Sequence, residues 1–302
     1  MGSDISETAE YIVNIMRNAG YVADTISYPS KNRSIDIVAY SNSKRVFLKT
    51  INNAEELSGA EIRDLKKIDA IYTAKVVIVA NMDNKKKLED DVVYCKSGIN
   101  MVTPQTLENY VLKGEKPFIA NIRGNYVLKI DPRKFQEKRR ELNLTRGEIA
   151  SILGLSRKSI YLYEHGEMMV SLNRALKLAE LLGEDMFCEF DIFSENVGEE
   201  HRYSSIESTM DIPEDNIEQF LWNIARRFNY MFVKLLRTPM DIVIKGNKSL
   251  VIVKEGRNME KIENAEKIAK AMSSRLISIS SLKDLEKIKN IIISELSADD
   301  KK

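Results

Sequence analysis

Apolar positions near the N-terminus recur at the spacing of a helix. The stretch YIVNIMRNAGY, residues 11–21, places its apolar side chains on one helical face. Ser6 is suited to cap this helix, and Gly20 is suited to end it. The pattern therefore predicts an amphipathic helix at the start of the chain.

The pattern then changes to short apolar runs bounded by polar residues, which are typical of buried strands. The predicted strands are 35–40, 45–51 and 76–80, and the predicted helices are 54–69 and 104–113. Helix, hairpin, helix and buried strand in this order indicate an α/β sandwich with a mixed sheet. Residues 117–130 hold two apolar runs around Arg123-Gly124-Asn125, which predicts a β-hairpin or connector.

The last part of the chain repeats the plan of the first. YIVNIMRNAGY aligns with FLWNIARRFNY (220–230), and IDIVAYSNSKRVFLKT aligns with MDIVIKGNKSLVIVKE. Asp36 precedes Lys49 by 13 positions, and Asp241 precedes Lys254 by the same 13 positions. Agreement in order, spacing and several identities predicts an internal duplication of one α/β domain.

Between these two regions, four short helices begin and end at clear signals. Asn143 ends the first, and Thr145 with Glu148 forms a capping box for the second. Ser156 caps the third, and Gly166 ends it. The first, third and fourth helices are expected over 133–142, 156–165 and 172–182. The side chains expected in their core include Ala150, Leu153, Ile160, Tyr163, Leu172, Ala175, Leu176, Leu178, Ala179 and Leu182.

The domain organisation follows from these elements. An acid-rich stretch after the helical block has the composition of an exposed linker, with one short strand at MFCEFDIF. The fold class is therefore α/β plus all-α, with two α/β domains flanking a small helical domain. The predicted boundaries are 1–115 (α/β), 116–130 (connector or β-hairpin), 131–184 (helical), 185–211 (acidic linker) and 212–302 (second α/β).

The two helices joined through Gly154-Leu155-Ser156 form a helix-turn-helix. The block resembles the Cro/phage-repressor type of helix-turn-helix domain, which is lambda-repressor-like in fold. That resemblance implies that the helix beginning at Ser156 lies in the major groove of double-stranded DNA. The matching residues are Leu144-Thr145, Glu148-Ile149-Ala150, Leu153-Gly154-Leu155-Ser156, Ile160, Tyr163-Glu164, Gly166 and Ser171-Leu172.

Exposed positions around this helix are the candidates for DNA contact. Arg157 and Lys158 are suited to guanine O6 and N7 or to phosphate oxygens, and the sequence leaves both open. Arg146 is expected on a phosphate at the start of the preceding helix, whereas Glu164 is assigned to structure. The expected DNA-binding residues are Arg139, Arg140, Arg146, Ser156, Arg157, Lys158, Ser159, Tyr161 and Leu162, and Lys134 and Lys138 add basic character to the first helix.

The flanking domains resemble the restriction-endonuclease-like fold, including archaeal Holliday-junction resolvases. In that family an Asp, and an acid two residues before a Lys, hold Mg²⁺ through oxygen ligands. The first copy keeps Asp36 and Lys49 but has Phe47 at the acid position. The second copy keeps Asp241 and Lys254 but has Ile252 there.

Because the same carboxylate is missing twice, both domains are expected to be catalytically inactive. We expect no catalytic residue, no metal and no cofactor, unless an acid such as Glu10 or Glu255 restores the site. Asp36 and Asp241 are then structural acids, each paired with a lysine at a strand end. The alternative is a Mg²⁺-dependent DNA endonuclease or junction-processing enzyme that the helix-turn-helix directs to its site.

Composition adds few further constraints. With 43% hydrophobic and 30% charged residues and a net charge of +1, the chain is globular, and any DNA affinity must come from a local basic patch. Cys95, Cys188, His165 and His201 lack metal-ligand spacing, and we expect both thiols to be buried and reduced. The polar start does not resemble a signal peptide, and no apolar run reaches the ~18 residues of a membrane span.

The sequence as a whole predicts a cytoplasmic, sequence-specific DNA-binding transcriptional regulator that is not an enzyme. Its expected partners are double-stranded DNA and a second copy in a homodimer, since such domains bind two half-sites. No membrane is involved, and a small-molecule effector is left open. The layout resembles a group of archaeal proteins classed as HTH-type transcriptional regulators.

Overall fold

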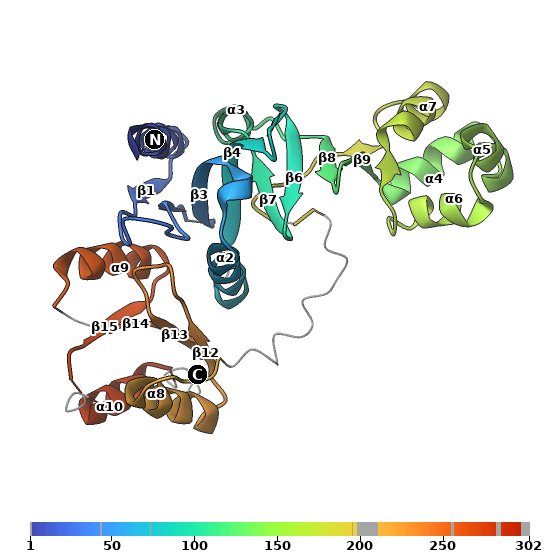
Figure 1. Ribbon diagram of the computed structural model, residues 1–302. Helices are drawn as coiled ribbons and strands as arrows, with labels where there is room; N and C mark the ends of the chain where they lie inside the picture. Colours follow the sequence, from blue (N-terminus) through green and yellow to red (C-terminus); the bar gives the residue numbers. More distant parts are fainter. Residues whose placement is uncertain are drawn as a thin grey trace. The chain divides into compact units, whose positions relative to one another are not determined.

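The computed structural model (Figure 1) describes residues 2–42, 44–72, 74–194, 196–197, 211–254, 257–281 and 285–296. The chain divides into two compact units. One contains Met1–Lys86 together with Glu200–Lys302, and the other contains Lys87–Glu199. The short strand β5 (Lys86–Lys87) falls at the boundary between them. In the described residues, no helix is both long and apolar enough to cross a membrane.

The N-terminal α/β part, residues 2–83, is the predicted sandwich with a mixed sheet. Its strands lie in the order β1-β2-β3-β4, with β1, β2 and β3 antiparallel and β4 parallel to β3. Helix α1 contacts the first three strands and α2 contacts β4. The elements are α1 (Gly2–Asn18), β1 (Val22–Thr25), β2 (Ile37–Tyr40), β3 (Arg45–Asn53), α2 (Gly59–Ile71) and β4 (Lys75–Asp83).

Two predicted boundaries in this part are wrong. The first helix begins at Gly2, so Ser6 lies inside it rather than at its cap, because nothing between Ser3 and Ser6 interrupts a helix. The helix expected over 54–69 is divided into a single 3₁₀ turn, Ala54–Glu56, and α2. The division occurs at Ser58, which caps α2 and forms a capping box with Glu61.

The C-terminal α/β part, residues 211–296, is built on the same topology. Its strands lie in the order β12-β13-β14-β15, again antiparallel, antiparallel and parallel. Figure 1 shows α9 on one face of this sheet and α8 with α10 on the other. The elements are α8 (Asn216–Arg227), β12 (Met231–Lys234), β13 (Ile242–Lys245), β14 (Ser249–Lys254), α9 (Met259–Ala271), β15 (Arg275–Ile279) and α10 (Leu285–Leu296).

The hairpins of the two parts differ in length by one residue. Four residues separate the paired Tyr40 and Arg45, whereas three separate the paired Lys245 and Ser249. Consequently Ile37 pairs with Leu48, and its counterpart Ile242 pairs with Ile252. A shift of one residue turns every later side chain to the opposite face of the sheet.

The expected equivalence of Lys49 with Lys254 is therefore wrong, as is that of Phe47 with Ile252. The backbone N–H of Thr50 donates to Asp36 Oδ2 over 2.7 Å, and that of Lys254 donates to Asp241 Oδ2 over 2.7 Å. Thus Lys254 occupies the place of Thr50, and Ile252 that of Leu48. The equal spacing of 13 residues hides the shorter hairpin.

The strands of the second unit lie in the order β7-β6-β8-β9-β10, and β11 also pairs with β9. The predicted hairpin over 117–130 is confirmed as β8 and β9, which turn at Arg123 and Gly124. The elements are β6 (Val92–Lys96), β7 (Ile99–Val102), α3 (Pro104–Glu108), a π-helical turn (Asn109–Lys113), β8 (Ile119–Ile122), β9 (Asn125–Ile130), β10 (Val170–Ser171) and β11 (Phe187–Cys188).

The four predicted helices of the helical block are confirmed as α4 (Pro132–Glu141), α5 (Arg146–Leu153), α6 (Arg157–Glu164) and α7 (Leu172–Leu182). The N–H of Asp131 donates to Met186 O over 2.8 Å, so strands β9 and β11 hold the two ends of the block together. Its core contains Phe135, Ile149, Ala150, Leu153, Ile160 and Tyr163.

Leu176 is not in this core, contrary to the prediction, because it is 58% exposed. The buried positions of α7 are Ala175, Leu178 and Leu182, and Leu172 and Ala179 are half-buried. Leu176 lies about 100° around the helix from Ala175, a geometry that follows from 3.6 residues per turn. Apolar character alone does not distinguish the two positions.

The stretch expected as an exposed acidic linker is buried at its apolar positions, whereas Asp185, Glu189 and Ser194 are exposed. Phe190, Ile192, Phe193 and Val197 are buried, and the Asn100 side chain bonds to Ile192 O and to Val197 N. Apolar residues between the acids supply this burial. Within the predicted linker, residue 195 and residues 198–210 lie outside the described residues.

The remaining predictions for this unit concern a strand and two thiols. The strand expected at MFCEFDIF is confirmed as β11. Cys95 and Cys188 are not joined in a disulfide, and both are half-buried rather than buried. Each lies on a short strand, one on β6 and one on β11.

The shorter hairpin gives a testable prediction at Gly246. A Cβ there would lie 2.7 Å from the Tyr230 ring and 3.2 Å from Leu296 O. We expect Gly246→Ala to reduce the free energy of unfolding by about 1–3 kcal/mol through overpacking. Thermal and urea unfolding measure this loss, and Gly59→Ala is the matched control because its Cβ meets only Arg63 at 3.4 Å. Equal stability of the two variants would contradict the described contact.

Candidate nucleic-acid interface

The turn between α5 and α6 is built by two capping residues. Gly154 ends α5 with φ 63°, a left-handed conformation that glycine adopts without strain. The Ser156 hydroxyl accepts the N–H of Ser159 over 3.1 Å and thereby starts α6. The Ser156 and Ser159 hydroxyls also lie 3.0 Å apart. Both expected DNA-binding serines are therefore engaged in the helix start.

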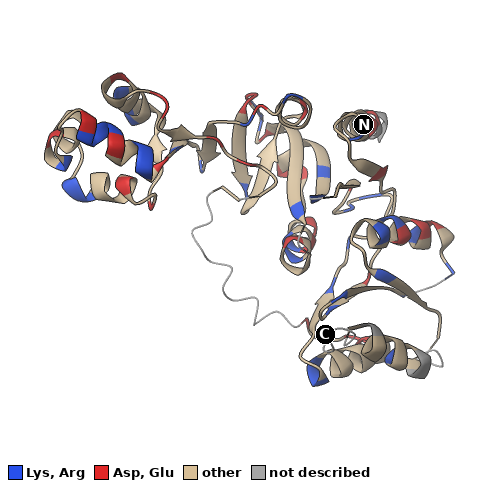
Figure 2. Ribbon diagram, turned by 180° about the vertical axis from the view of Figure 1, so that it is seen from behind, with Lys and Arg blue, Asp and Glu red and all other residues tan. Residues whose placement is uncertain are grey.

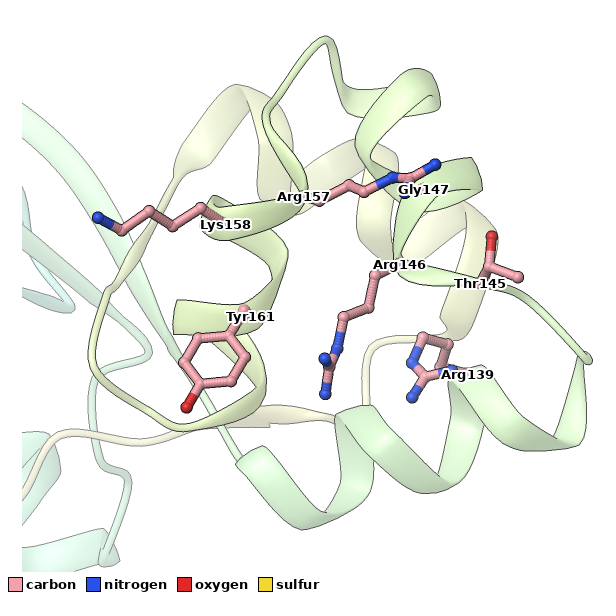
Figure 3. A pocket seen from close by; sticks show the side chains of 7 residues that line it. All are labelled: Arg139, Thr145, Arg146, Gly147, Arg157, Lys158 and Tyr161. Atoms are coloured by element: carbon pink, nitrogen blue, oxygen red, sulfur yellow. The ribbon is translucent and has the colours of Figure 1, made fainter.

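Most of the expected basic residues gather beside this turn. The helical block carries an open pocket of about 700 Å³. The pocket is lined by Arg139, Thr145, Arg146, Gly147, Arg157, Lys158 and Tyr161 (Figure 3). Figure 2 shows that acidic residues are interspersed with basic ones on this block, so the positive charge is local. A concave surface with four cationic side chains is suited to an anionic backbone.

Arg157 and Lys158 point in different directions. In Figure 3 the Arg157 side chain crosses toward Gly147 on α5, whereas Lys158 extends away from it. A Cβ at Gly147 would lie 3.0 Å from Arg157 Nε, so glycine leaves the space that the guanidinium fills. Arg157 is thereby associated with the start of α5, and Lys158 is free to extend from the surface.

Tyr161 is held between two neighbours. Its ring stacks on His165 with centroids 3.9 Å apart, and the Arg146 guanidinium lies 5.3 Å from its centroid. The side chain is nevertheless 42% exposed. A restrained aromatic ring on the exposed face of α6 loses little entropy on contact with DNA.

Glu164 lies beneath this surface and anchors two of its arginines. It is fully buried, and its carboxylate forms ion pairs with Arg139 Nε and Arg146 Nε. Arg139 also donates to Leu144 O over 2.8 Å, and Gln136 donates to Glu164 O over 2.9 Å. The assignment of Glu164 to structure is confirmed.

The other expected residues lie outside this pocket. Arg140 is exposed and Leu162 is half-buried. Lys134 donates to Asp185 O over 2.9 Å, and Lys138 lies 3.4 Å from Asp185 Oδ2. Part of the basic character of α4 is therefore directed to this acid.

The nuclease-like position of the N-terminal part is a buried ion network. Asp36 Oδ1 lies 2.6 Å from Arg33 Nε, and Oδ2 lies 3.2 Å from Lys49 Nζ. The N–H and hydroxyl of Thr50 also donate to Oδ2. Phe47 is fully buried and packs on Tyr72, so an aromatic contact fills the acid position.

The acid that approaches Lys49 is Glu61, which the sequence interpretation missed. Glu61 Oε1 lies 3.4 Å from Lys49 Nζ, and Oε2 accepts the N–H and hydroxyl of Ser58. The capping box Ser58-x-x-Glu61 was the available signal. Glu10, the acid considered from α1, is exposed, and Glu255 lies outside the described residues.

The C-terminal part pairs its charges differently. Asp241 lies 2.8 Å from Lys261 on α9, and burial raises the pKa of its carboxyl although Lys261 and Lys254 oppose this. Lys254 instead lies 2.5 Å from Glu218 on α8 and 2.7 Å from Asp215, the residue that caps α8. Within the chain as described, no group of three or more His, Cys, Asp or Glu residues could hold a metal ion.

The fold and the basic surface define the class of protein, a helix-turn-helix DNA-binding protein with an additional nuclease-like domain. The comparisons agree. The model for a PD-(D/E)XK superfamily domain matches residues 6–117, and the model for a helix-turn-helix matches residues 135–187. No solved structure matches the chain.

Archaeal proteins are similar over nearly the whole chain. A Sulfolobus acidocaldarius protein is 30% identical over 290 residues, which is 93% of this chain and 92% of the relative. An Aeropyrum pernix protein is 30% identical, covering 95% and 92%, and a Pyrococcus horikoshii protein is 27% identical, covering 95% and 91%. Each is named "Putative HTH-type transcriptional regulatory protein". The chain belongs to this family of archaeal HTH-type regulators, and the predicted resemblance is confirmed.

The buried acid of α6 gives the prediction for this site. We expect Glu164→Gln to lower the free energy of unfolding by about 2–4 kcal/mol, because two guanidinium groups lose the carboxylate that neutralises them. Calorimetry of the full chain measures the loss. Glu141→Gln, at an exposed acid that ends α4, is the control and should leave stability within about 0.5 kcal/mol. If both variants unfold alike, Glu164 is not the anchor.

Proposed function

We propose that this chain is a sequence-specific transcriptional regulator that contacts double-stranded DNA through α6. The observation that carries the proposal is the basic surface of Arg139, Arg146, Arg157 and Lys158 beside a helix-turn-helix turn. A phosphate backbone supplies most of the affinity for such a surface, and side chains in the groove supply the choice of sequence. Membership of the regulator family supports the same conclusion.

The side-chain directions suggest which residues contact the DNA backbone and which contact the bases. Arg139 and Arg146 are fixed on Glu164, and Arg157 is directed to the start of α5, which suits contacts to the sugar-phosphate backbone. Lys158 and Tyr161 extend from the exposed face of α6, which suits contacts to base edges. Arg140, Ser156, Ser159 and Leu162 remain candidates at the edge of this surface.

We further propose that the flanking domains are inactive derivatives of one duplicated nuclease-like domain. Their sheets share strand order and directions, and the duplicated domains would be 1–115 and 212–302. The connector 116–130, the helix-turn-helix domain 131–184 and the segment 185–211 would lie between them. Asp36 and Glu61 already accept hydrogen bonds or ion pairs on both oxygens, which leaves little capacity for a magnesium ion.

A regulator of this kind would act in the cytoplasm as a homodimer. Each chain has one helix-turn-helix, whereas two-fold symmetric operators present two half-sites about one helical turn apart. A small-molecule effector remains an open addition to this proposal. Cofactors are not part of it.

We expect the double substitution Arg157→Ala/Lys158→Ala to weaken binding to duplex DNA by roughly ten- to a hundred-fold. Two positive charges leave the surface, so the slope of log K against log salt should also fall by about 1–2. The DNA for this test is first selected from a random pool with the wild-type protein. Fluorescence anisotropy at several salt concentrations then measures the affinity and the salt slope.

The matched control removes the same charge elsewhere on the helical block. Arg174→Ala/Lys177→Ala changes two exposed bases on α7, outside the pocket, and should keep affinity within about two-fold. Equal weakening by both double variants would indicate a nonspecific charge effect. Unchanged binding after loss of Arg157 and Lys158 would sink the proposal.

A Mg²⁺-dependent endonuclease is the second candidate function, favoured by the PD-(D/E)XK match and by two acids beside Lys49. Our proposal expects no cleavage of plasmid or branched DNA with Mg²⁺ or Mn²⁺, because the acids are buried and already paired. Cleavage that disappears in Asp36→Ala, at equal protein folding, would establish the enzyme instead. Gel assays at equal DNA occupancy separate this result from a failure to bind.

A further inference from the structure

Two equivalent helices each place one polar side chain on a loop of the other α/β part. Asp64 lies six positions after Ser58, the cap of α2, and Asn264 lies six positions after Asn258, the cap of α9. Asp64 accepts the N–H groups of Leu236 (3.1 Å) and Arg237 (2.6 Å). Asn264 Oδ1 accepts the N–H of Ser27 over 2.7 Å.

The two receiving loops are themselves equivalent. Thr25 pairs with Ile37 at the end of β1, and Lys234 pairs with Ile242 at the end of β12. Ser27 and Leu236 each follow that strand end by two residues. Asp64 and Asn264 therefore make the same contact in opposite directions.

Lysines on the two helices repeat this reciprocity. Lys67 Nζ donates to Lys234 O over 2.9 Å, and Lys267 Nζ donates to Thr25 O over 3.0 Å. Each lysine lies three residues beyond its Asp64 or Asn264, and each acceptor is the last residue of its strand. The same lysine-to-carbonyl hydrogen bond is therefore made once from each helix to the strand of the other part.

The hairpins supply a third contact in each direction, although from different strands, since Arg45 lies on β3 and Lys245 on β13. Arg45 Nε donates to Ala271 O over 3.1 Å, and Lys245 Nζ donates to Ile71 O over 2.5 Å. Ala271 and Ile71 are the last residues of α9 and α2, where unpaired carbonyl groups favour cations. Contacts made once in each direction are the mark of a two-fold, isologous interface.

We propose that the two α/β parts pair with each other as an intramolecular pseudo-dimer. The α2 face of the N-terminal part is the surface, and its partner is the C-terminal part of the same chain, residues 231–271. Asp64 is only 1% exposed, and burial raises the pKa of its carboxyl. The N–H groups of Arg237 and Leu236, the Ser34 hydroxyl and Lys67 lower the pKa but do not cancel this effect. If Asp64 and Asn264 were absent, the N–H groups that they accept would be left without partners in the interface.

The pairing also brings a loop near each nuclease-like position. Ser34, two residues before Asp36, donates its N–H to Arg237 O over 2.7 Å. The Tyr28 ring lies 5.8 Å from Lys261 Nζ, the partner of Asp241. Each part thus places a loop beside the aspartate of the other.

This interface limits how two chains can associate. Because its self-complementary face is used within one chain, a second chain must bind through another surface. The pairing does not depend on DNA binding, since its contacts lie in the unit that lacks the helix-turn-helix.

Amide hydrogen exchange of the full chain tests the pairing. Asp64→Ala removes the acceptor of the Leu236 and Arg237 amides, and their exchange should accelerate by roughly ten-fold or more. The decisive amide is Ser27, which Asn264 holds at the reciprocal contact. Its exchange should also accelerate, because opening a shared interface frees both sides, while Ile149 in the helix-turn-helix stays unchanged.

Asp64→Asn is the matched variant, since it gives the N-terminal part the residue that serves at position 264. It should accelerate the three amides less than Asp64→Ala, and Asn264→Ala should reproduce the full pattern from the other side. Unchanged Ser27 exchange in Asp64→Ala, at retained fold by circular dichroism, overturns the proposal. Sedimentation provides a second test. If the wild-type protein is a dimer and Asp64→Ala is a monomer, the α2 face joins two chains, and the intramolecular pairing is overturned.

Discussion

Buried carboxylates that accept otherwise unpaired donors are the constraint on which this structure depends. Asp36 and Asp241 each take the N–H of the neighbouring strand at the end of a hairpin, and each also pairs with a cation. Removal of either carboxylate would leave buried donors without partners. This requirement explains why both aspartates stand at nuclease-like positions without a second acid at 47 or at 251, the structural counterpart of 47.

The same constraint organises the proposed DNA-binding surface. Glu164 is buried between two arginines that would otherwise repel each other and move freely in solvent. Its carboxylate brings Arg139 and Arg146 to the pocket that Arg157 and Lys158 complete from α6. The ion pairs that stabilise the helical block therefore also position two arginines of the proposed DNA-binding surface.

Local signals predicted much of the fold and of the candidate site. The capping box of Thr145 and Glu148 marks the start of α5, and Gly154 marks its end. These signals can be read from the sequence because their hydrogen bonds join residues a few positions apart. Leu176 and the segment around Ile192 were misjudged, since burial there depends on contacts with distant elements. Glu61 was overlooked for the same reason, as its approach to Lys49 requires α2 to fold over β3.

The sequence by itself determined the identity of the helix-turn-helix, the mixed α/β plan and the absence of an acid two residues before Lys49. These depend on spacing and residue type along a short stretch of chain. Only the tertiary structure decided that Lys254 corresponds to Thr50, because strand register is set by the length of the hairpin turn and not by the count between two residues. It alone also decided that α2 and α9 exchange the same contacts, since residues about 170 to 240 positions apart must first be brought together.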